Sequence, residues 1–581
     1  METAAAAVAF ITIAVNSFQA CVQAFEFFNT AQHIGPDGDF FRTGLEFEKY
    51  RLIAWARRVG IHQENKRSAL NWTLASLLLE QLRLFLTSAE GLKSRYSLDV
   101  SEEEIQESEK LRALDPPKHG VSKLIARLKP TVYTTSAQII QANNAPIKRL
   151  LWATRDKEKL KRIVGEISEL IDKLEFLLDD DERLSERTRY AKLLREVVSL
   201  TSTAAEAGQV GDLIGDGSHL SHDKLAIKAA VHVKQIRLVV GIDKRNDEVK
   251  PTTSKEIMGL RIEDLKVLRR SLKPWDKEPL RYEGLEFASY KSKQVLIQWK
   301  IAEGNEWEMY QGQMKCLAML LGSIHDNSFR SLPCMGYYPL QIHGRHGVVY
   351  EVPVTETSCT FRSLKDLMLD QVHVSLGRRF EISKALAETV LQLHTAGWMH
   401  KSLRPENIIF LAPQGSDDSA FLKTEPILVG YDYARADDEG AAAAYTQLPD
   451  TELEADLYRH PQARGRNRER YQKRFDLYSL GCILLELGCW LRLRDIFSEH
   501  SNGELADRIA KAAENNEVFE LPTVNELLEK DTASAFLEHH AGEKFKDTVL
   551  LCCSVKKAGE TTEGLLREQL EVIQTLDWCR V

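Results

Sequence analysis

The sequence lacks the marks of several common classes of protein. Its nine cysteines are scattered from Cys21 to Cys579 without a CxxC pair, so we expect neither a disulfide framework nor a zinc site, and a reducing cytoplasmic compartment suits them. The formal net charge is -8 over 581 residues, which supplies no basic excess for binding nucleic acid. We therefore expect no resident metal and no nucleic-acid partner.

A long apolar run is also missing. Residues 4–15 are almost wholly apolar, but a polar stretch that begins at Asn16 interrupts the run before residues 22–28. A membrane-spanning helix needs about 20 apolar residues. A secretory signal needs early basic residues, whereas the only early charge here is Glu2. We expect no removable signal peptide, and a first helix over residues 4–28 that could enter a membrane only marginally.

What is present is the composition of an ordinary globular protein, with 43% apolar and 28% charged residues. A chain of this length is too long for one hydrophobic core, so more than one domain is expected. We predict a helical bundle over residues 1–220, a connector over residues 221–280 and a second domain over residues 281–581.

The first of these regions shows helical periodicity throughout. In residues 157–178 the apolar side chains recur with a period of about 3.6, and charged residues fill the opposite face. Residues 68–86 are apolar on nearly every side, which is typical of a helix buried at the centre of a bundle. Further amphipathic helices are expected at residues 39–59 and 186–200, and no alternating strand pattern is visible. We predict an all-α bundle that ends at a glycine-dense hinge, residues 208–217.

The rest of the chain changes character. The connector contains one strand-like run, residues 236–242, and one helical stretch, residues 255–272. Strand-like segments follow at residues 295–300 and 347–353, and long helices come after them. This order favours an α+β domain that is bilobal, with a small β lobe and a larger helical lobe.

One motif in the second domain is more specific. Residues 400–408 read His-Lys-Ser-Leu-Arg-Pro-Glu-Asn-Ile and resemble H-R-D-L-K-P-E-N-I, the catalytic-loop signature of protein kinases. Other segments resemble further parts of that family in the expected order: the fourth and fifth strands at residues 332–337 and 348–353, the end of an activation segment at 458–461, and a buried helix at 475–486 whose Asp476 caps the catalytic loop. The resemblance implies a protein-kinase-like fold for residues 281–581.

The same resemblance shows that the catalytic groups are replaced. Ser402 stands where kinases place the aspartate that orients the substrate hydroxyl, and loss of a general base costs on the order of 10²- to 10⁴-fold. Arg404 replaces the lysine of the loop, while Asn407 is retained. The metal-binding aspartate of the D-F-G motif becomes Gly430, and only a frame shifted by two residues, starting at Asp432, restores it.

The nucleotide-binding elements are also incomplete. The glycine-rich loop is expected within residues 281–294, which contain a single glycine. Lys300 is the candidate for the third-strand lysine, although the register also allows Gln298, and the following helix, residues 309–321, has no acidic residue to pair with it. We expect a pseudokinase with no catalytic residues and no required cofactor. Binding of ATP and magnesium through Lys300 and Asn407 stays open.

Structural roles compete with functional ones at these positions. His400 and Asp476 are expected to hold the backbone of the lobe together, and Asn407 to brace its loop. Lys300 is equally well explained as a lysine at the end of a strand. Asp437 starts an acidic stretch that is typical of a solvated loop.

Two segments of the helical half are distinctive. The apolar first helix ends in Phe-Glu-Phe-Phe at residues 25–28, and residues 39–60 carry a helix with a Leu, Arg-Leu, Trp and Arg pattern. Together they resemble the start of a HeLo domain, the helical module of fungal prion-inhibition and heterokaryon-incompatibility proteins, over residues 1–220. The resemblance implies a cell-death executioner, in which oligomerisation through a protein partner or through self-association makes the first helix insert into a membrane.

The leading hypothesis is a fungal signalling protein of allorecognition, heterokaryon incompatibility or regulated cell death. Its HeLo bundle would be the effector, regulated by a catalytically inactive kinase-like domain, and it would be cytoplasmic and associated with the plasma membrane when active. Two alternatives belong to other classes. One is an atypical active kinase or ATP-binding protein that uses Asp432 and Asn407, and the other is a pure interaction scaffold.

Overall fold

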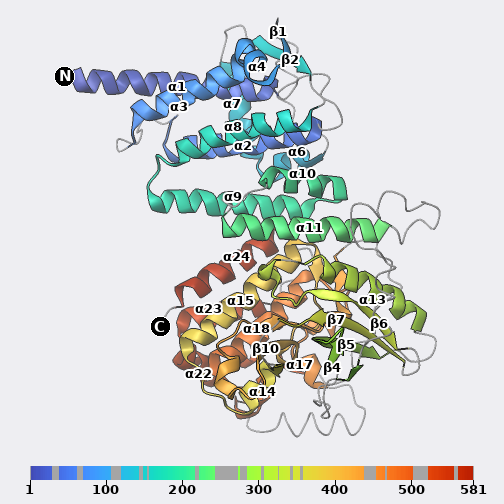
Figure 1. Cartoon of the computed structure of the whole chain (residues 1–581). Coiled ribbons are helices and arrows are strands. Elements are labelled where there is room, and N and C mark those ends of the chain that lie inside the picture. The colour runs from blue at the N-terminus through green and yellow to red at the C-terminus, as the bar shows by residue number, and fades with distance from the viewer. Residues whose placement is uncertain are drawn as a thin grey trace. The chain divides into compact units, whose positions relative to one another are not determined.

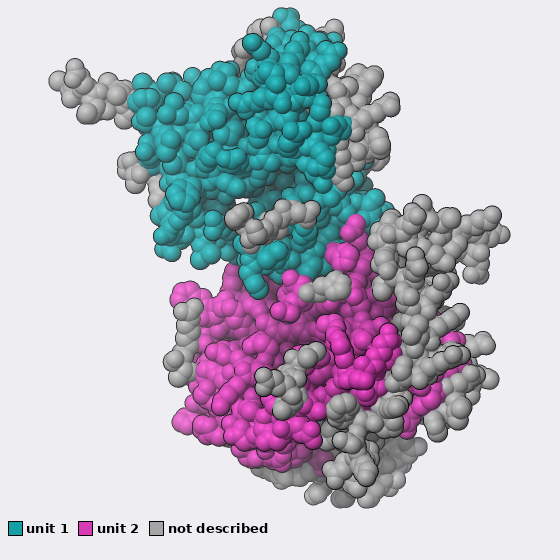
Figure 2. Space-filling model, in the orientation of Figure 1, with its two compact units in different colours: residues 1–231 teal, residues 232–581 magenta. Residues whose placement is uncertain are grey.

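The structure of the chain is a computed structural model, drawn as a ribbon in Figure 1. It describes residues 2–28, 38–61, 70–105, 120–142, 148–153, 156–215, 221–242, 273–274, 284–301, 307–324, 326–340, 344–353, 358–437, 453–464, 468–500, 521–554 and 561–579. The chain divides into two compact units, Met1–Val231 and His232–Val581, which Figure 2 shows in different colours. Helix α11 (His222–Ile242) begins in the first unit and ends in the second.

The first unit is built mainly from helices. Besides the first half of α11 they are α1 (Glu2–Phe28), α2 (Gly38–Arg58), α3 (Trp72–Thr87), α4 (Ala89–Tyr96), α6 (Gly120–Leu128), α7 (Pro130–Ala142), α8 (Lys157–Glu175), α9 (Asp180–Leu200) and α10 (Ala204–Ile214). The helices predicted from periodicity correspond to α2, α3, α8 and α9. Each of these has apolar residues on at least one face, and burying that face is what stabilises a helix in a globular protein.

An antiparallel ribbon interrupts these helices and corrects the prediction of an all-α bundle. Strand β1 (Asp99–Glu104) pairs with β2 (Lys148–Ala153), so that Asp99 lies opposite Ala153 and Glu104 opposite Lys148. The sequence of β1 is almost entirely acidic or polar, and only Val100 is buried in it. Its partner strand lies more than 40 residues further along the chain, and pairing between such distant segments does not appear in the pattern of either strand alone.

The predicted glycine hinge is also wrong, because residues 208–214 belong to α10. That helix starts with a capping box, in which the Thr203 hydroxyl accepts from the Glu206 backbone N–H at 3.1 Å and the Glu206 carboxylate accepts from the Thr203 N–H at 3.2 Å. The helix ends at Gly215, whose φ of 80° lies in the left-handed region. The Thr-x-x-Glu signal was present in the sequence, and it indicates a helix start more reliably than glycine content indicates a hinge.

Helix α3 is exposed along one side, contrary to the prediction of a central buried helix. Leu79 and Leu82 are fully buried, whereas Leu74, Leu77 and Leu84 are 41%, 60% and 50% exposed. The helix packs against α1 and α8 with its other face. Its apolar composition therefore supplies an exposed leucine stripe in addition to a core face.

The connector contains a helix where a strand was expected. Residues 236–242 form the C-terminal end of α11, and Val233, Ile236 and Leu238 of this helix are all buried. A short run rich in valine and isoleucine does not distinguish a buried helix from a strand by periodicity. The helix predicted at residues 255–272 lies outside the described residues.

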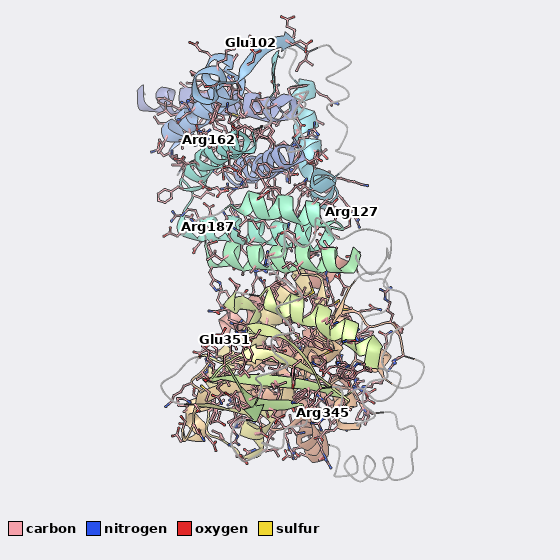
Figure 3. The ribbon with its side chains drawn as sticks, turned by 45° about the vertical axis from the view of Figure 1, so that its right-hand side comes forward. Glu102, Arg127, Arg162, Arg187, Arg345 and Glu351 are labelled. Carbon is pink, nitrogen blue, oxygen red and sulfur yellow. The ribbon has the colours of Figure 1, made fainter. Side chains whose placement is uncertain are left out.

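The second unit contains a five-stranded antiparallel sheet with the order β3-β4-β5-β7-β6. Its strands are β3 (Lys273–Pro274), β4 (Leu285–Tyr290), β5 (Lys293–Ile301), β6 (Cys334–Leu340) and β7 (Arg345–Glu351), and helix α13 (Trp307–Gly322) connects β5 to β6. Figure 3 labels both ends of β7. The strands expected at residues 295–300 and 347–353 correspond to β5 and β7. The glycine-rich loop was expected within residues 281–294. Residues 281–283 lie outside the described residues, and residues 285–294 form β4, its turn and the start of β5.

The remainder of the second unit is mostly helical. Its helices are α14 (Leu364–Leu369), α15 (Leu376–Thr395), α16 (Asp418–Phe421), α17 (Leu453–Leu457), α18 (Lys473–Cys489), α19 (Leu493–His500), α21 (Val524–Leu528), α22 (Asp531–Ala541), α23 (Glu543–Cys553) and α24 (Thr562–Trp578). Small antiparallel sheets join β8 (Cys359–Ser363) and β11 (Ile427–Leu428) to β10 (Ile408–Pro413), and β12 (Arg435–Ala436) to β9 (Trp398–Met399). Helix α18 is buried from Arg474 to Cys489 and lies at the centre of this part.

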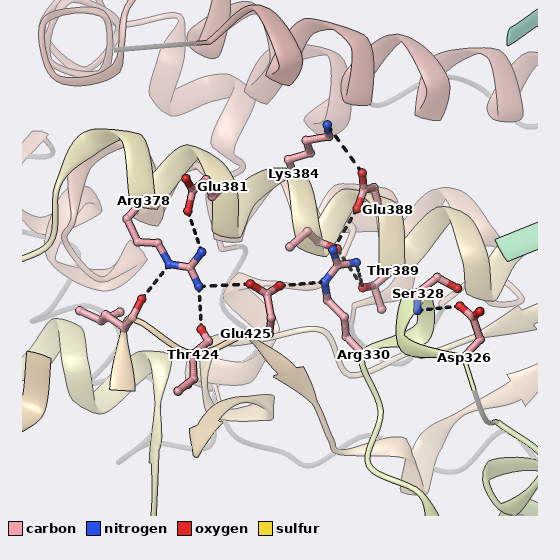
Figure 4. A network of polar contacts seen from close by, with 12 residues as sticks. Asp326, Ser328, Arg330, Arg378, Glu381, Lys384, Glu388, Thr389, Thr424 and Glu425 are labelled. Atoms are coloured by element: carbon pink, nitrogen blue, oxygen red, sulfur yellow. Dashed lines mark hydrogen bonds and ion pairs between the residues drawn. The ribbon is translucent and has the colours of Figure 1, made fainter. Parts of the chain in front are cut away.

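Arg330 ties the segment before β6 to this helical part, as the close view in Figure 4 shows. Its guanidinium lies 3.0 Å from the Glu388 carboxylate on α15 and 3.7 Å from the Glu425 carboxylate before β11. Glu425 in turn lies 3.7 Å from Arg378 at the start of α15. The Arg330 carbonyl also accepts from the Leu428 N–H at 2.7 Å. Side-chain and backbone contacts together therefore set the position of β11, and of the residues that follow it.

Candidate functional site

The residues singled out in the second domain converge on Asp432. This residue lies in the 3-10 turn η6 (Tyr431–Tyr433), directly after β11. Its carboxylate is 3.1 Å from the Lys300 ammonium and accepts from the Gln298 amide at 3.2 Å. Positions 298 and 300 are two residues apart on β5 and so point to the same face of the sheet. The sequence left the choice between these two residues open, and the structure brings both to the same carboxylate.

Lys300 is held in an ion pair with most of its surface covered. Its ammonium also lies 3.7 Å from the centre of the Tyr433 ring, a cation–π contact. Burial acts to lower the pKa of Lys300, but Asp432 and Tyr433 outweigh it and the pKa is raised. The carboxylate that the structure places beside this lysine is that of Asp432, on the turn after β11.

Gln298 connects three elements of the second unit. Its amide oxygen accepts from the Gly430 N–H at 3.1 Å and from the Tyr350 hydroxyl at 3.1 Å, while its amide nitrogen donates to Asp432. The side chain is almost fully buried. Its donors and acceptors are therefore used within the protein, which is how a buried amide avoids a desolvation cost.

Gly430 lies where only glycine fits. Its φ of 84° is in the left-handed region, and a Cβ built on it would come within 2.3 to 2.5 Å of the Asn407 side-chain amide. Real Cβ atoms do not approach other atoms so closely. The Asn407 side chain thus occupies the space that an aspartate at position 430 would require.

Asn407 is turned toward its own loop. Its amide nitrogen donates to the Ser402 carbonyl at 2.7 Å and to the Ser402 hydroxyl at 3.1 Å. Its backbone carbonyl accepts from the Val429 N–H at 2.9 Å. Arg404 precedes the 3-10 turn η5 (Pro405–Asn407) on the same loop. Asn407 braces this loop, which is the structural role considered for it from the sequence.

Asp476 at the start of α18 holds the same loop from its other end. Its carboxylate accepts from the backbone N–H groups of His400 and Lys401 at 2.7 and 2.8 Å, and lies 3.2 Å from a His394 ring nitrogen. Burial acts to raise the pKa of Asp476, but these histidines and the Tyr471 hydroxyl outweigh it and lower the pKa. The geometry agrees with the backbone-holding role expected of His400 and Asp476.

The candidate site offers few metal ligands. Within the described part of the chain, no group of three or more histidine, cysteine, aspartate or glutamate side chains is arranged to hold a metal ion. Asp432 itself already faces the Lys300 ammonium and the Gln298 amide. A divalent cation at this carboxylate would have to compete with the lysine charge.

A second polar site lies in the first unit, where Lys49 on α2 anchors α1. The Lys49 ammonium is buried, 2.8 Å from the Glu26 carboxylate on α1 and 2.9 Å from that of Glu46. The Tyr133 hydroxyl on α7 donates to Glu46 at 2.6 Å. Burial raises the pKa of Glu26, although Lys49 opposes this effect. We call these four residues the Lys49 cluster.

The sequence reading did not identify this cluster, because its charged residues look like solvent-facing positions on amphipathic helices. A neighbouring set joins α2 to α8, where Arg51 pairs with Glu48 at 3.0 Å, with Glu175 at 2.8 Å and with Asp172. Removing one partner of a buried ion pair such as these strongly destabilises the protein, since the other charge is left without compensation.

The anchored part of α1 is its second half. Ser17 donates to the Glu80 carboxylate on α3 at 2.8 Å, and Phe18, Val22 and Phe25 are buried. Ile13, by contrast, is 45% exposed. The apolar run is therefore at most partly buried over residues 9–13, and the core contacts of α1 come from residues 14–28.

Among the described helices, none has the length and apolar character needed to cross a membrane. This finding includes α1, in which the residues Ser17, Gln23 and Glu26 lower the apolar character of the buried half.

Comparison with known proteins identifies the first region. Residues 5–239 match the family model described as HeLo, prion-inhibition and propagation. The chain is 26% identical over 165 residues to heterokaryon incompatibility protein S of Podospora anserina, which is 27% of this chain and 53% of the relative. It is 25% identical over 166 residues to heterokaryon incompatibility protein s of the same organism, with the same coverage.

The HeLo resemblance predicted for the N-terminal region is thus confirmed, and the match extends through most of α11. The chain spans about half the length of the curated relatives it matches.

Proposed function

We propose that the chain is a signalling protein of fungal heterokaryon incompatibility or regulated cell death. Its HeLo region is the effector, and its second unit is an inactive protein-kinase-like regulator. The single observation that carries the effector part is the HeLo match over residues 5–239, together with the two relatives that are heterokaryon incompatibility proteins. Self-association or a protein partner supplies the trigger.

The kinase-like part of the proposal is supported by topology. The sheet order β3-β4-β5-β7-β6, with α13 between β5 and β6, suits the five strands and single helix of a kinase small lobe. The loop at residues 400–407 lies between the end of α15 and β10, and Asp476 holds its backbone from the start of a buried helix. Both features support the kinase-like part of the proposal.

The absence of phosphoryl transfer is supported by the geometry around position 430. Transfer requires a metal-binding carboxylate and a group that orients the attacking hydroxyl. Ser402 supplies no carboxylate, and Asn407 fills the space next to Gly430. Asp432 is engaged by Lys300 and Gln298. The second unit is therefore proposed to act by binding and conformation.

The effector part is supported by the way α1 is held. Its second half is held by the buried Lys49 cluster and by the hydrogen bond from Ser17 to Glu80, while Ile13 in its first half is exposed. A short apolar segment gains only marginal membrane affinity alone, and multivalency raises that affinity strongly. Oligomerisation would thus convert a weak membrane contact into insertion of residues 4–28 at the plasma membrane.

The test is dye release from anionic liposomes by the full chain carrying a chemically induced oligomerisation domain. We expect the oligomerising agent to trigger release, and Ile13→Asp to abolish it. The matched control is Leu77→Asp, which places the same charge at another exposed apolar position in the same unit. The proposal would be contradicted if the oligomerised wild-type chain left the liposomes intact. It would also be contradicted if Ile13→Asp and Leu77→Asp reduced dye release equally.

A second candidate, an ATP-binding protein or atypical kinase, is favoured by the contact between Lys300 and Asp432 at 3.1 Å. A lysine and an aspartate in this position suit phosphate and metal binding. Under this alternative, magnesium and ATP raise the unfolding temperature of the wild-type chain, and Asp432→Ala removes the effect. An unfolding temperature that magnesium and ATP leave unchanged, or that they raise equally in Asp432→Ala, argues against this alternative.

A further inference from the structure

The second half of α11 carries buried positive charge. Lys234 and Arg237 are 1% and 5% exposed, on a helix whose neighbouring positions Val233, Ile236 and Leu238 are buried as well. Burying a lysine or an arginine is costly unless a carboxylate compensates for it. The question is therefore which group compensates for these charges in the second unit.

Asp437, directly after β12, supplies that compensation. One of its carboxylate oxygens lies 3.4 Å from the Arg237 guanidinium, and the other lies 2.5 Å from the ammonium of Lys473 at the start of α18. Burial alone would raise the pKa of Asp437, but Lys473, Arg237 and Lys234 outweigh it and lower the pKa to about 2. The carboxylate therefore stays ionised and holds α11 and α18 at once, contrary to the solvated loop that the sequence suggested.

The backbone around this group is shaped to admit the arginine. The Asp437 N–H donates to the Gly397 carbonyl at 3.1 Å. Gly397 has a φ of 73°, and a Cβ there would lie 2.8 Å from the Arg237 guanidinium and 2.9 Å from the Asp437 carboxylate. A side chain at position 397 would thus displace the ion pair. We call Asp437, Arg237 and Lys473 the charge latch.

All three latch residues belong to the second unit, but Arg237 also lies inside the region that matches the HeLo family, which extends to residue 239. The last helix of the effector region is therefore held by a carboxylate that the effector region does not itself provide. We propose that the charge latch is an autoinhibitory contact, through which the second unit restrains the HeLo effector until Asp437 is displaced. This inference rests on the proposed function.

The contact is tested in the full chain with Asp437→Asn, which removes the charge and keeps the shape. We expect hydrogen exchange in peptides covering residues 232–242 to accelerate at least about tenfold, as for a helix end released from packing. Arg237→Gln should give the same effect while leaving the Asp437–Lys473 pair intact, and the double variant should add little to either single variant. The matched control is Asp456→Asn, whose partner Arg459 is three residues away in the same unit.

If Asp437→Asn also accelerates hydrogen exchange throughout α18, the substitution has destabilised the second unit as a whole. In that case the exchange of residues 232–242 in Arg237→Gln tests whether the charge latch exists. Unchanged exchange in residues 232–242 in Arg237→Gln would overturn the latch.

The autoinhibitory effect of the latch is measured in the liposome assay, as the dose of oligomerising agent that gives half-maximal dye release. We expect the latch variants to need about tenfold less agent than the wild-type chain, a coupling typical of allosteric contacts. If the latch variants accelerate hydrogen exchange in α11 but need the same dose of agent as the wild-type chain, the contact is not autoinhibitory. A wild-type chain that never releases dye would instead refute the proposed function, and the exchange result would still report whether the contact exists.

Discussion

At the scale of single residues, buried charges carry much of the information in this molecule. Lys49, Arg51 and Asp437 are all charged residues that a sequence pattern assigns to the surface. Lys49 and Arg51 are buried, Asp437 is partly buried, and each lies against charges of opposite sign. Sequence reasoning misses them because charged positions on amphipathic helices and in acidic loops are usually solvated, and only the fold shows which opposite charges lie beside them. By contrast, the positions of Ser402 and Asn407 in the loop were predictable, because both residues belong to one continuous motif.

Lys49→Met should destabilise the first unit by about 3–5 kcal/mol, because Glu26 and Glu46 lose their buried cation. The measurement is hydrogen exchange of α1 peptides in increasing denaturant. The control is Lys173→Met, which breaks an exposed pair with Glu169 and should cost within about 0.5 kcal/mol. Equal effects of the two substitutions would contradict the role given to the Lys49 cluster.

Gly430→Ala should destabilise the second unit by about 1–3 kcal/mol, since the new methyl group meets the Asn407 amide at a left-handed backbone position. Gly377→Ala in α15 is the matched control, because nothing lies within 4 Å of its Cβ position and its backbone is helical. The control should be neutral or stabilising by about 0.4–1 kcal/mol. Thermal unfolding measures both, and a stable Gly430→Ala protein would show that Asn407 is free to move away.

At the scale of elements, long periodic helices were predictable and short or mixed elements were not. The apolar stripe of α8 gave its position directly, because burial of a continuous face dominates the stability of such a helix. The position of α18 came from the motif at residues 475–486. The ribbon of β1 and β2 depends on pairing between segments that lie far apart in sequence. The second half of α11 looks like a strand because both structures can bury a run of valine and isoleucine.

The buried helix α18 also predicts a pH dependence. Burial raises the pKa of Glu486 to about 8, against hydrogen bonds from the Tyr458 hydroxyl and the Leu493 N–H that favour the carboxylate. A pKa raised on folding means that the native state holds a proton that the unfolded chain releases above about pH 4.5. The stability contributed by this group is therefore complete below that pH and is lost as the pH rises toward 8.

We expect the unfolding free energy of the wild-type chain to fall between these pH values by at most about 1.4 kcal/mol per pH unit relative to Glu486→Gln. Denaturant unfolding at several pH values measures the difference. The exposed Glu538→Gln should keep the wild-type slope. A Glu486→Gln protein with the wild-type slope would show that Glu486 is ionised in the folded state.

At the scale of the whole molecule, the chain combines a HeLo region with a unit of different architecture, and helix α11 runs from one unit into the other. Two domains were predictable from length and from the change in composition. The contacts that hold α11 were not, because they depend on which carboxylate of the second unit meets Arg237. Regulation of the effector is thus proposed to depend on the position of Asp437 rather than on catalysis.

The central claim is that association, and not phosphoryl transfer, activates the chain. The most direct measurement compares dye release by the chemically oligomerised full chain with no nucleotide and with magnesium and ATP. We predict the same extent of release under both conditions, and the same again for Asp432→Ala. Release that requires magnesium and ATP, and that disappears in Asp432→Ala, would contradict the account.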